Sequence, residues 1–294
     1  GPTLSPKHEA KLRRYLENTL FPVLGRKLVA HLEPADFLAV VQPAERMGHN
    51  ETAHKLMRLC GQVTRYARIT GRVKYDVAAG LTEALRPVQN THFAAVTEPE
   101  AIGQLLRDID DYTGHTSVLF CLKILPYVFT RPSELRLAQW SEFDLEGAVW
   151  RIPAKRMKMR REHVVPLAHQ VLAMLHELHR YTGNCEFLFP SIRALTTPIS
   201  DMAPLAALRR MGYAKDAMTL HGFRAMASSL LNEMGWRPDV IERQLAHAER
   251  NKVRAAYHRA EYLDDRRKLL QWLADFYESQ QGGNVRPVNF HRAG

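Results

Sequence analysis

Residues 148–167 read AVWRIPAKRMKMRREHVVPL, and this segment carries the clearest β-strand pattern in the chain. Apolar residues alternate with polar ones over residues 148–153 and again over residues 162–167, which is the period of a strand with one buried face. Residues 154–161 between them form a very basic turn of lysines and arginines. The segment therefore predicts a hairpin of two antiparallel strands joined by a positively charged turn.

Helical periodicity surrounds this hairpin on both sides. Residues 51–72 form the clearest helix of the first third, and residues 98–100 start another with proline and acids in its first turn. Further helices are expected over residues 168–181, 198–210, 222–234, 238–245, 252–258 and 264–278. The predicted fold class is mainly α with a small antiparallel β-sheet, an α+β fold.

The length of the chain predicts two domains, because 294 residues exceed one ordinary core. Residues 85–99 contain several prolines and few periodic apolar positions, which is typical of a linker. We predict a helical domain over residues 1–88, a linker over residues 89–97 and a second domain over residues 98–279. Residues 280–294 are expected to form a flexible tail.

The charge balance favours a polyanionic partner. The chain has 41 Lys and Arg against 31 Asp and Glu, a net charge of +10, which attracts nucleic acid first and anionic membrane second. Its three cysteines form no CxxC pair, so we expect a reducing compartment and no disulfide framework or zinc ribbon. The longest apolar run, residues 117–129, is interrupted by Lys123 and Pro126 and is too short to span a bilayer.

Two groups of basic residues are candidates for contact with a nucleic acid backbone. The helix expected over residues 51–72 is predicted to bury one apolar face, made of Leu56, Leu59, Val63, Tyr66 and Ala67. Its opposite face carries the first basic group, which consists of Arg58, Arg65, Arg68 and Arg72. A solvated helix face explains this first group equally well. The second group lies in the turn of the hairpin and consists of Lys155, Arg160 and Arg161.

Motifs for nucleotide or metal chemistry are absent from the sequence. It contains no Walker phosphate loop, no GxGxxG and no acidic cluster typical of a metal site. His176 and His179 flank Glu177 but lack the i, i+4 spacing of zinc-binding histidines, so an exposed helix face is the preferred interpretation. We therefore expect no metal and no cofactor, and an enzyme that cleaves phosphodiesters here would do so without a metal.

Side chains suited to phosphate chemistry lie in four separate segments. Arg131 stands in the segment TRPSELR, directly after an apolar helix. His221 and Arg224 are three residues apart at a helix start, so they share one face near an N-terminus that suits anions. His247 lies in the segment QLAHA, and Tyr257 comes ten residues later.

This combination resembles the catalytic domain of the tyrosine recombinases, especially the integrases of phages and genomic islands. The resemblance covers roughly residues 98–277 and fills every catalytic position of the family. The matching residues are Arg131 of Arg-x-x-Glu-Leu, the hairpin lysine Lys158, His221 and Arg224 of His-x-x-Arg, the late histidine His247, and the nucleophile Tyr257. The resemblance implies a site-specific DNA recombinase that cuts and rejoins strands through a 3′-phosphotyrosyl intermediate, integrating or excising a mobile element.

The chemistry of phosphodiester cleavage gives each matching residue a role. Arg131 and Arg224 can hold the non-bridging oxygens of the phosphate as negative charge builds up on them. His247, together with His221, can donate hydrogen bonds or move a proton. A tyrosine has a pKa near 10, so only about one Tyr257 in a thousand is ionised at neutral pH. Tyr257 therefore needs a base, and His221 is our candidate.

Supporting roles and structural alternatives accompany this assignment. The resemblance places Lys158, on its hairpin, as the general acid that protonates the leaving 5′ oxygen. Glu134 is expected to be a buried residue that orients the arginines. Purely structural explanations also exist: a salt bridge to Glu134 for Arg131, a helix cap for His221, and core packing for His247.

The sequence departs from the family pattern before the first arginine. The family usually has Thr-Gly-x-Arg, whereas here Phe129 and Thr130 precede Arg131 and Pro132 follows it. Proline suits the first position of a helix. The departure concerns the orientation of Arg131 and not its presence.

The end of the chain predicts a packed helix after the nucleophile. Tyr262 competes with Tyr257 as nucleophile but fits better as a packing residue that opens this helix. An apolar stripe follows, made of Leu263, Leu269, Leu270, Trp272, Leu273, Phe276 and Tyr277. The stripe can pack on its own domain or dock on a neighbouring protomer.

The resemblance also implies partners. Residues 1–88 occupy the place of the family's helical core-type DNA-binding domain, which forms a clamp around double-stranded DNA with the catalytic domain. A homo-tetramer assembled on attachment sites, an accessory directionality factor and a bacterial cytoplasmic, nucleoid-associated location are expected. Three rivals remain: a type IB topoisomerase-like enzyme that relaxes DNA, a non-cleaving DNA-binding regulator of the same fold, and a basic interaction protein with accidental matches.

Overall fold

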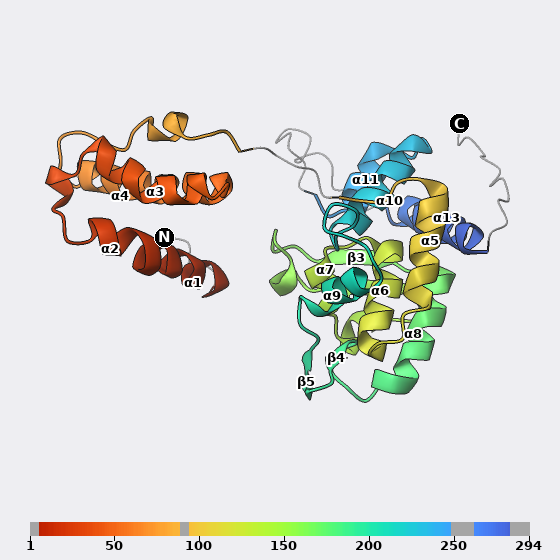
Figure 1. Ribbon diagram of the computed structural model, residues 1–294. Coiled ribbons are helices and arrows are strands. Elements are labelled where there is room, and N and C mark those ends of the chain that lie inside the picture. Colours follow the sequence, from red (N-terminus) through yellow and green to blue (C-terminus); the bar gives the residue numbers. More distant parts are fainter. Residues whose placement is uncertain (1–5, 89–93, 248–261, 283–294) are drawn as a thin grey trace. The chain divides into compact units, whose positions relative to one another are not determined.

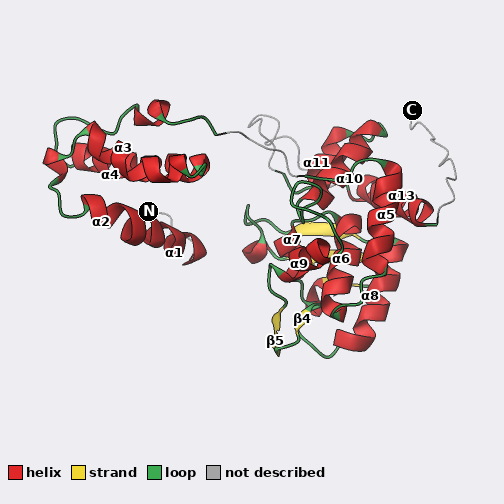
Figure 2. Ribbon diagram, viewed as in Figure 1, coloured by secondary structure: helices red, strands yellow, loops and turns green. Residues whose placement is uncertain are grey.

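The computed structural model describes residues 6–88, 94–247 and 262–282 (Figure 1). The chain divides into two compact units, Gly1–Thr91 and His92–Gly294, and each has its own apolar core. Helices dominate both units, and short antiparallel strands lie in the second (Figure 2). The fold class is therefore mainly α with small antiparallel sheets, as the sequence predicts. The expected domain limits stay predictions, and residues 89–93 of the expected linker lie outside the described residues.

The first unit is a small helical assembly. Its elements are α1 (Pro6–Tyr15), the π-helical turn η1 (Leu16–Leu20), α2 (Phe21–Leu24), the 3-10 turns η2 (Val29–His31) and η3 (Leu81–Ala84), and the longer helices α3 (Pro34–Arg46) and α4 (Asn50–Ile69). The helices α3 and α4 pack together and bury Phe37, Val41 and Leu56 between them. At the start of α3, the Asp36 carboxylate accepts a hydrogen bond from the Glu33 N–H at 3.0 Å, which satisfies a donor that the helix leaves unpaired.

The buried face of α4 differs from the predicted one. Leu56 and Ala67 are buried as expected, but Val63 and Tyr66 are 52% and 60% exposed. Thr64 lies in the core in their place, because its hydroxyl donates to the Asp76 carboxylate and also lies within hydrogen-bond distance of backbone carbonyls of its own helix. A polar residue with these partners can be buried, and periodicity alone does not reveal the partners.

The second unit surrounds a buried central helix. Its helices are α5 (Pro99–Asp110), α6 (Thr116–Val128), α7 (Pro132–Arg136), α8 (His169–Thr182), α9 (Ala203–Arg210), α10 (Gly222–Glu233), α11 (Pro238–Gln244) and α13 (Leu263–Gln281), with 3-10 turns η4 (Trp140–Glu142) and η5 (Ala154–Arg156). The central helix α6 is apolar on nearly all sides and contacts α5, α8, α9 and α13. A helix that is apolar all round is stable only when other elements cover it.

The predicted hairpin is confirmed. Strands β2 (Val149–Ile152) and β3 (His163–Pro166) pair antiparallel, with Val149 opposite Pro166 and Ile152 opposite His163. A short strand β1 (Phe143–Asp144) joins β2 on its other edge, which gives the sheet order β1-β2-β3. The hairpin therefore presents the basic loop between β2 and β3 at one end of a buried sheet.

The helix predicted over residues 198–210 begins later than expected. Residues 194–198 form strand β5 (Ala194–Pro198), which pairs with β4 (Pro190–Ser191), and α9 starts only at Ala203. Proline cannot continue a helix from within, but Pro204 fits the first turn of α9. Residues 194–198 are therefore a strand because they pair with β4, and the helix begins only after this pairing ends.

The last helix packs on its own unit, which is one of the two placements that its apolar stripe allowed. Helix α13 lies beside α5 (Figure 1), and Leu269, Leu273 and Tyr277 are fully buried. Tyr277 meets Tyr127 of α6 edge-on, with ring centroids 5.3 Å apart. At its C-terminal end, the Arg107 guanidinium donates to the Gln280 carbonyl at 2.9 Å. None of the described helices is both long enough and apolar enough to cross a membrane.

Candidate active site

Arg131 is presented by a sharp turn between α6 and α7. Helix α6 ends at Val128, and its C-cap residue Phe129 has a φ of 30° and a ψ of 38°, which lie in the left-handed region. This residue stands where the family pattern has glycine, which adopts such a conformation freely. Phe129 is fully buried, and its packing holds a backbone conformation that costs a non-glycine residue about 1–2 kcal/mol. The departure from the family pattern thus leaves the turn intact.

Glu134 orients Arg131 from below. Its carboxylate accepts from the Arg131 backbone N–H at 2.9 Å and from the Arg131 Nη1 at 2.7 Å. Glu134 is 4% exposed while the Arg131 side chain keeps 22% of its surface exposed. The salt bridge and the predicted orienting role are therefore the same interaction: a buried carboxylate fixes a guanidinium whose outer edge stays open.

Arg224 on α10 is held even more firmly. Its Nη1 donates to the Phe129 carbonyl at 2.7 Å and its Nη2 donates to the Leu245 carbonyl at 2.8 Å. Burial, followed by the positive charge of Arg131, lowers the pKa of Arg224 to about 10. The guanidinium still carries its charge at neutral pH, so two fixed cations face the same region.

His247 joins the two arginines through the turn that follows α11. Its Nε2 lies 3.3 Å from the Arg224 Nη2, and the Arg131 Nη2 donates to the neighbouring Ala246 carbonyl at 3.5 Å. The turn itself depends on a left-handed Ala246, with a φ of 50°. The structure therefore brings Arg131, Arg224 and His247 together, although they are far apart in the sequence.

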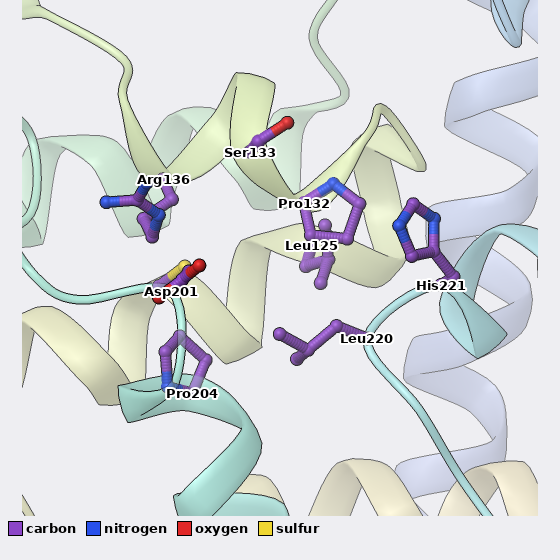
Figure 3. A pocket seen from close by; sticks show the side chains of 9 residues that line it. Leu125, Pro132, Ser133, Arg136, Asp201, Pro204, Leu220 and His221 are labelled. Carbon is purple, nitrogen blue, oxygen red and sulfur yellow. The ribbon is translucent and has the colours of Figure 1, made fainter. Parts of the chain in front are cut away.

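His221 lies at the N-cap position of α10, and it keeps an exposed surface. Burial, with Arg224 and Arg131 nearby, lowers the pKa of His221 below its usual value of 6.5. The imidazole is therefore neutral at physiological pH and able to accept a proton. A cavity of about 240 Å³ lies beside the ring, lined by Leu125, Pro132 and Leu220 among others (Figure 3). His221 thus borders open space as well as the arginines.

The basic loop contains both exposed and partly buried cations. Lys155, Lys158, Arg160 and Arg161 are exposed. Arg156 turns inward, where it pairs with Glu142 at 3.1 Å and donates to the Glu134 carbonyl at 2.9 Å. The base of the loop is therefore tied to the helix that carries Glu134, while Lys158 lies on the exposed part.

Sequence reasoning missed a buried polar network beneath the site. Arg266 of α13 is fully buried, and its Nε donates to the Gln244 Oε1 at 2.9 Å. The Gln244 side-chain amide in turn donates to the Val128 carbonyl at 2.9 Å. The backbone carbonyl of Gln244 lies 3.1 Å from the His163 Nε2. The network ties α13, α11, α6 and β3 together. One signal was available, because Arg266 falls on the apolar stripe of its helix at the spacing of Leu263, Leu270 and Leu273.

Tyr257 and the helix expected over residues 252–258 lie outside the described residues. Of the four arginines expected on the helix over residues 51–72, Arg58, Arg65 and Arg68 lie on α4, and Arg72 follows its end; all four are exposed. Among the described residues, no three acidic, histidine or cysteine side chains gather closely enough to hold a metal ion.

Comparisons with known proteins agree with this geometry. The model of the phage integrase family matches residues 96–263, and the model of the phage integrase central domain matches residues 1–84. The chain belongs to the phage integrase family, whose members are tyrosine recombinases.

Curated relatives are integrases of phages and prophages. The chain is 37% identical to the integrase of Enterobacteria phage P4 over 93% of its own length and 66% of that protein's. It is 36% identical to the putative protein IntB of Escherichia coli K12, covering 97% of this chain and 76% of the relative. The integrase of Shigella phage Sf6 is 34% identical over 93% of this chain and 71% of its own length. The chain therefore spans about two thirds to three quarters of these relatives.

Solved structures share the fold. Lambda integrase (75–356), solved as a dimer bound to a COC′ core site, matches with a TM-score of 0.68 at 14% identity, over 89% of this chain and 91% of that one. The Tn1549 transposon integrase (82–397), in complex with circular intermediate DNA, matches with a TM-score of 0.65 at 14% identity, over 88% and 95%. At this level of identity the likeness concerns the fold.

Proposed function

We propose that this chain is a site-specific DNA recombinase that breaks and rejoins DNA strands through a covalent link to Tyr257. The observation that carries the proposal is the turn after α11, which holds both arginines. Arg224 donates to the Leu245 carbonyl, and Arg131 donates to the carbonyl of the next residue. Two guanidiniums held in this way form a site for one tetrahedral anion, which a scissile phosphate would occupy.

The chemistry follows from the groups around that position. Arg131 and Arg224 stabilise the charge that builds up on the non-bridging oxygens, and removing one such donor costs about 3–4 kcal/mol in the barrier. His221, neutral at physiological pH because burial lowers its pKa, accepts the proton of the Tyr257 hydroxyl. Lys158 protonates the 5′ oxygen when the loop closes on DNA. The phosphotyrosyl bond keeps the energy of the broken phosphodiester, so rejoining uses no ATP.

Double-stranded DNA is the proposed substrate, supported by the exposed basic groups. Lys155, Arg160 and Arg161 on the hairpin loop would contact the backbone near the cleaved phosphate. Arg58, Arg65 and Arg68 of α4, with Arg72 just after it, would contact the backbone from the first domain. Residues 1–88 would act as the core-binding domain and residues 98–279 as the catalytic domain, joined by the linker over residues 89–97.

Assembly on DNA is proposed by analogy with the structural relatives. One of them is a lambda integrase tetramer bound to a Holliday junction, with a TM-score of 0.68. A tetramer of this chain would bring together two attachment sites and exchange strands between them. An accessory factor would select integration or excision, and the reaction would take place in the bacterial cytoplasm, at the nucleoid.

A covalent-trapping experiment tests the proposal. The protein is incubated in EDTA with a DNA duplex nicked near the candidate site, so that the short cleaved fragment diffuses away. Wild type should form an adduct that survives denaturation, and Tyr257→Phe should form none while it still binds DNA. Tyr262→Phe is the matched control, because Tyr262 is the N-cap residue of α13 and its ring centroid lies 5.3 Å from the guanidinium carbon of Arg237. This variant should form the adduct normally.

Three results would contradict the proposal. One is an adduct that persists in Tyr257→Phe, which would place the nucleophile elsewhere. Another is relaxation of supercoiled DNA without strand exchange between two sites, which would favour the topoisomerase-like alternative. The third is a protein that binds its site but never forms an adduct, as expected of a non-cleaving regulator.

A further inference from the structure

A carboxylate stands behind the histidine of the candidate site. Glu242 lies on α11, just over one helical turn before His247, and its Oε2 is 2.8 Å from the His247 Nδ1. The other ring nitrogen, Nε2, is 3.3 Å from the Arg224 Nη2. The ring therefore lies between a carboxylate and a guanidinium, with one nitrogen directed at each.

These two contacts define the protonation of the ring. A carboxylate only accepts hydrogen bonds, so the His247 Nδ1 carries a proton and donates it to Glu242. A guanidinium only donates, so the His247 Nε2 presents its lone pair to Arg224. The contacts together select the neutral tautomer with hydrogen on Nδ1, and leave Nε2 on the side of the phosphate-binding arginines.

We propose that Glu242 is a positioning residue that holds His247 for the phosphate. This inference rests on the proposed recombinase function. When a phosphate binds Arg224, the Nε2 loses its donor and takes up a proton from solvent. The imidazolium then donates from Nε2 to a non-bridging oxygen, while Glu242 stabilises the charge from behind. Arg131 and Arg224 oppose that charge from the other elements of the site, and Glu134 lies beneath Arg131.

The main chain holds the turn without help from the Glu242 side chain. The His247 N–H donates to the Glu242 backbone carbonyl at 3.1 Å, and the Leu245 and Ala246 carbonyls accept from the arginines. Removing the carboxylate therefore frees the ring but leaves its backbone in place. The variants below are expected to fold and to bind DNA.

A simple surface ion pair is the competing explanation. The side chains of His247 and Glu242 are 46% and 57% exposed, and exposed pairs contribute little to stability. A surface pair of this kind predicts no effect on cleavage. The positioning role predicts a loss of cleavage rate that depends on His247, because Glu242 acts only through that ring.

The test measures single-turnover adduct formation on the nicked duplex, with DNA affinity measured separately. Glu242→Ala should slow adduct formation about 10- to 100-fold, by analogy with the carboxylates that orient metal-bound histidines. Glu242→Gln keeps an acceptor for the Nδ1 hydrogen but not the charge, and should recover part of that loss. Glu177→Ala, which removes an exposed glutamate from α8, is the matched control and should react like wild type.

The dependence on His247 is measured in a double-mutant cycle. In a His247→Ala background, Glu242→Ala should change the rate less than about 2-fold, because the ring it orients is gone. The inference is overturned if Glu242→Ala reacts like Glu177→Ala, or if it slows the reaction equally with and without His247. A wild-type protein that forms no adduct overturns the proposed function itself, and that result is distinct from a wild-type adduct with unaffected Glu242 variants.

Discussion

The cations of the candidate site and those of the basic hairpin loop are the same residue types in opposite surroundings. Arg224 is 8% exposed and binds two backbone carbonyls, and Arg131 is fixed by the buried carboxylate of Glu134. Lys155 and Arg160 on the loop are exposed to solvent. Cations of the first kind are oriented before any anion binds, whereas cations of the second kind, as solvated charges, can act on a polyanion only through their long-range field.

The positive charges of this chain therefore fall into two classes, oriented donors and solvated charges. Oriented donors stabilise a transition state because they need no reorganisation when the charge develops. Solvated charges mainly displace counterions from the DNA, so their effect is strong at low salt and weak at high salt. Adjacent residues can belong to different classes: Lys155 is solvated, whereas the side chain of Arg156 turns inward and binds Glu142 and the Glu134 carbonyl.

The largest effect is expected from breaking the oriented kind. Arg224→Ala should lower the rate of adduct formation about 10²- to 10³-fold, because one donor to the phosphate is removed. Arg224→Lys keeps the positive charge but not the planar fork, and should also lose most of the rate while folding more readily. Single-turnover trapping at saturating DNA measures both. If Arg224→Lys cleaved DNA at the wild-type rate, positive charge alone would be sufficient, and the distinction between oriented and solvated cations would not matter for catalysis.

A second, smaller effect concerns His163, at the point where the exposed loop becomes buried strand β3. It is 3% exposed, and burial, followed by the positive charge of Arg266, lowers its pKa to about 3. Between that value and the ordinary value of 6.5, the unfolded chain binds a proton that the folded protein does not. Stability should therefore fall as pH falls through this window, by up to about 1.4 kcal/mol per pH unit.

Urea unfolding of wild type and His163→Gln, each at about pH 7 and about pH 5.5, measures this contribution. Wild type should lose about 1 kcal/mol more than His163→Gln between the two conditions. His176→Gln, which changes an exposed histidine of α8, should keep the wild-type dependence. Equal pH dependence in wild type and His163→Gln would show that His163 is not held neutral in the fold.

The smallest effect on stability is expected from the exposed loop. Replacing Lys155, Arg160 and Arg161 together by glutamine should change the free energy of unfolding by less than about 0.5 kcal/mol. The slope of log affinity for DNA against log salt should become shallower by roughly 0.9 for each phosphate that the loop no longer neutralises. DNA binding across a salt series measures this, with Arg180→Gln on α8 as a control that removes one exposed charge outside the loop. An unchanged slope would remove the loop from the DNA interface.

Local pattern was sufficient for much of the fold. The alternation of residues 148–153 and 162–167 correctly predicts the hairpin of β2 and β3. Helices α8, α10 and α11 begin and end within a residue or so of their predicted limits. Elements whose identity depends on a distant partner were not predicted. Strand β5 needs β4 beside it, and the buried Thr64 of α4 needs Asp76. Periodicity describes one segment, whereas these features belong to pairs of segments.

The candidate site divides in the same way. The order and spacing of Arg131, His221, Arg224 and His247 are visible in the sequence, because they follow from matching a family motif. Glu242 is one more glutamate on a polar helix until the fold places it against His247. Arg266 reads as part of an exposed charged run, and only its place in the apolar stripe of α13 suggests burial.

The sequence by itself determined the helical and strand periods, the excess of positive charge and the set of residues able to handle a phosphate. These properties depend on residue type and spacing along the chain. Only the tertiary structure decided which arginines are oriented and which are solvated, how a buried phenylalanine replaces a glycine before Arg131, and which carboxylate contacts which histidine. Burial and hydrogen-bond geometry arise from segments that are distant along the chain, and they decide whether a charge is fixed in place or free in water.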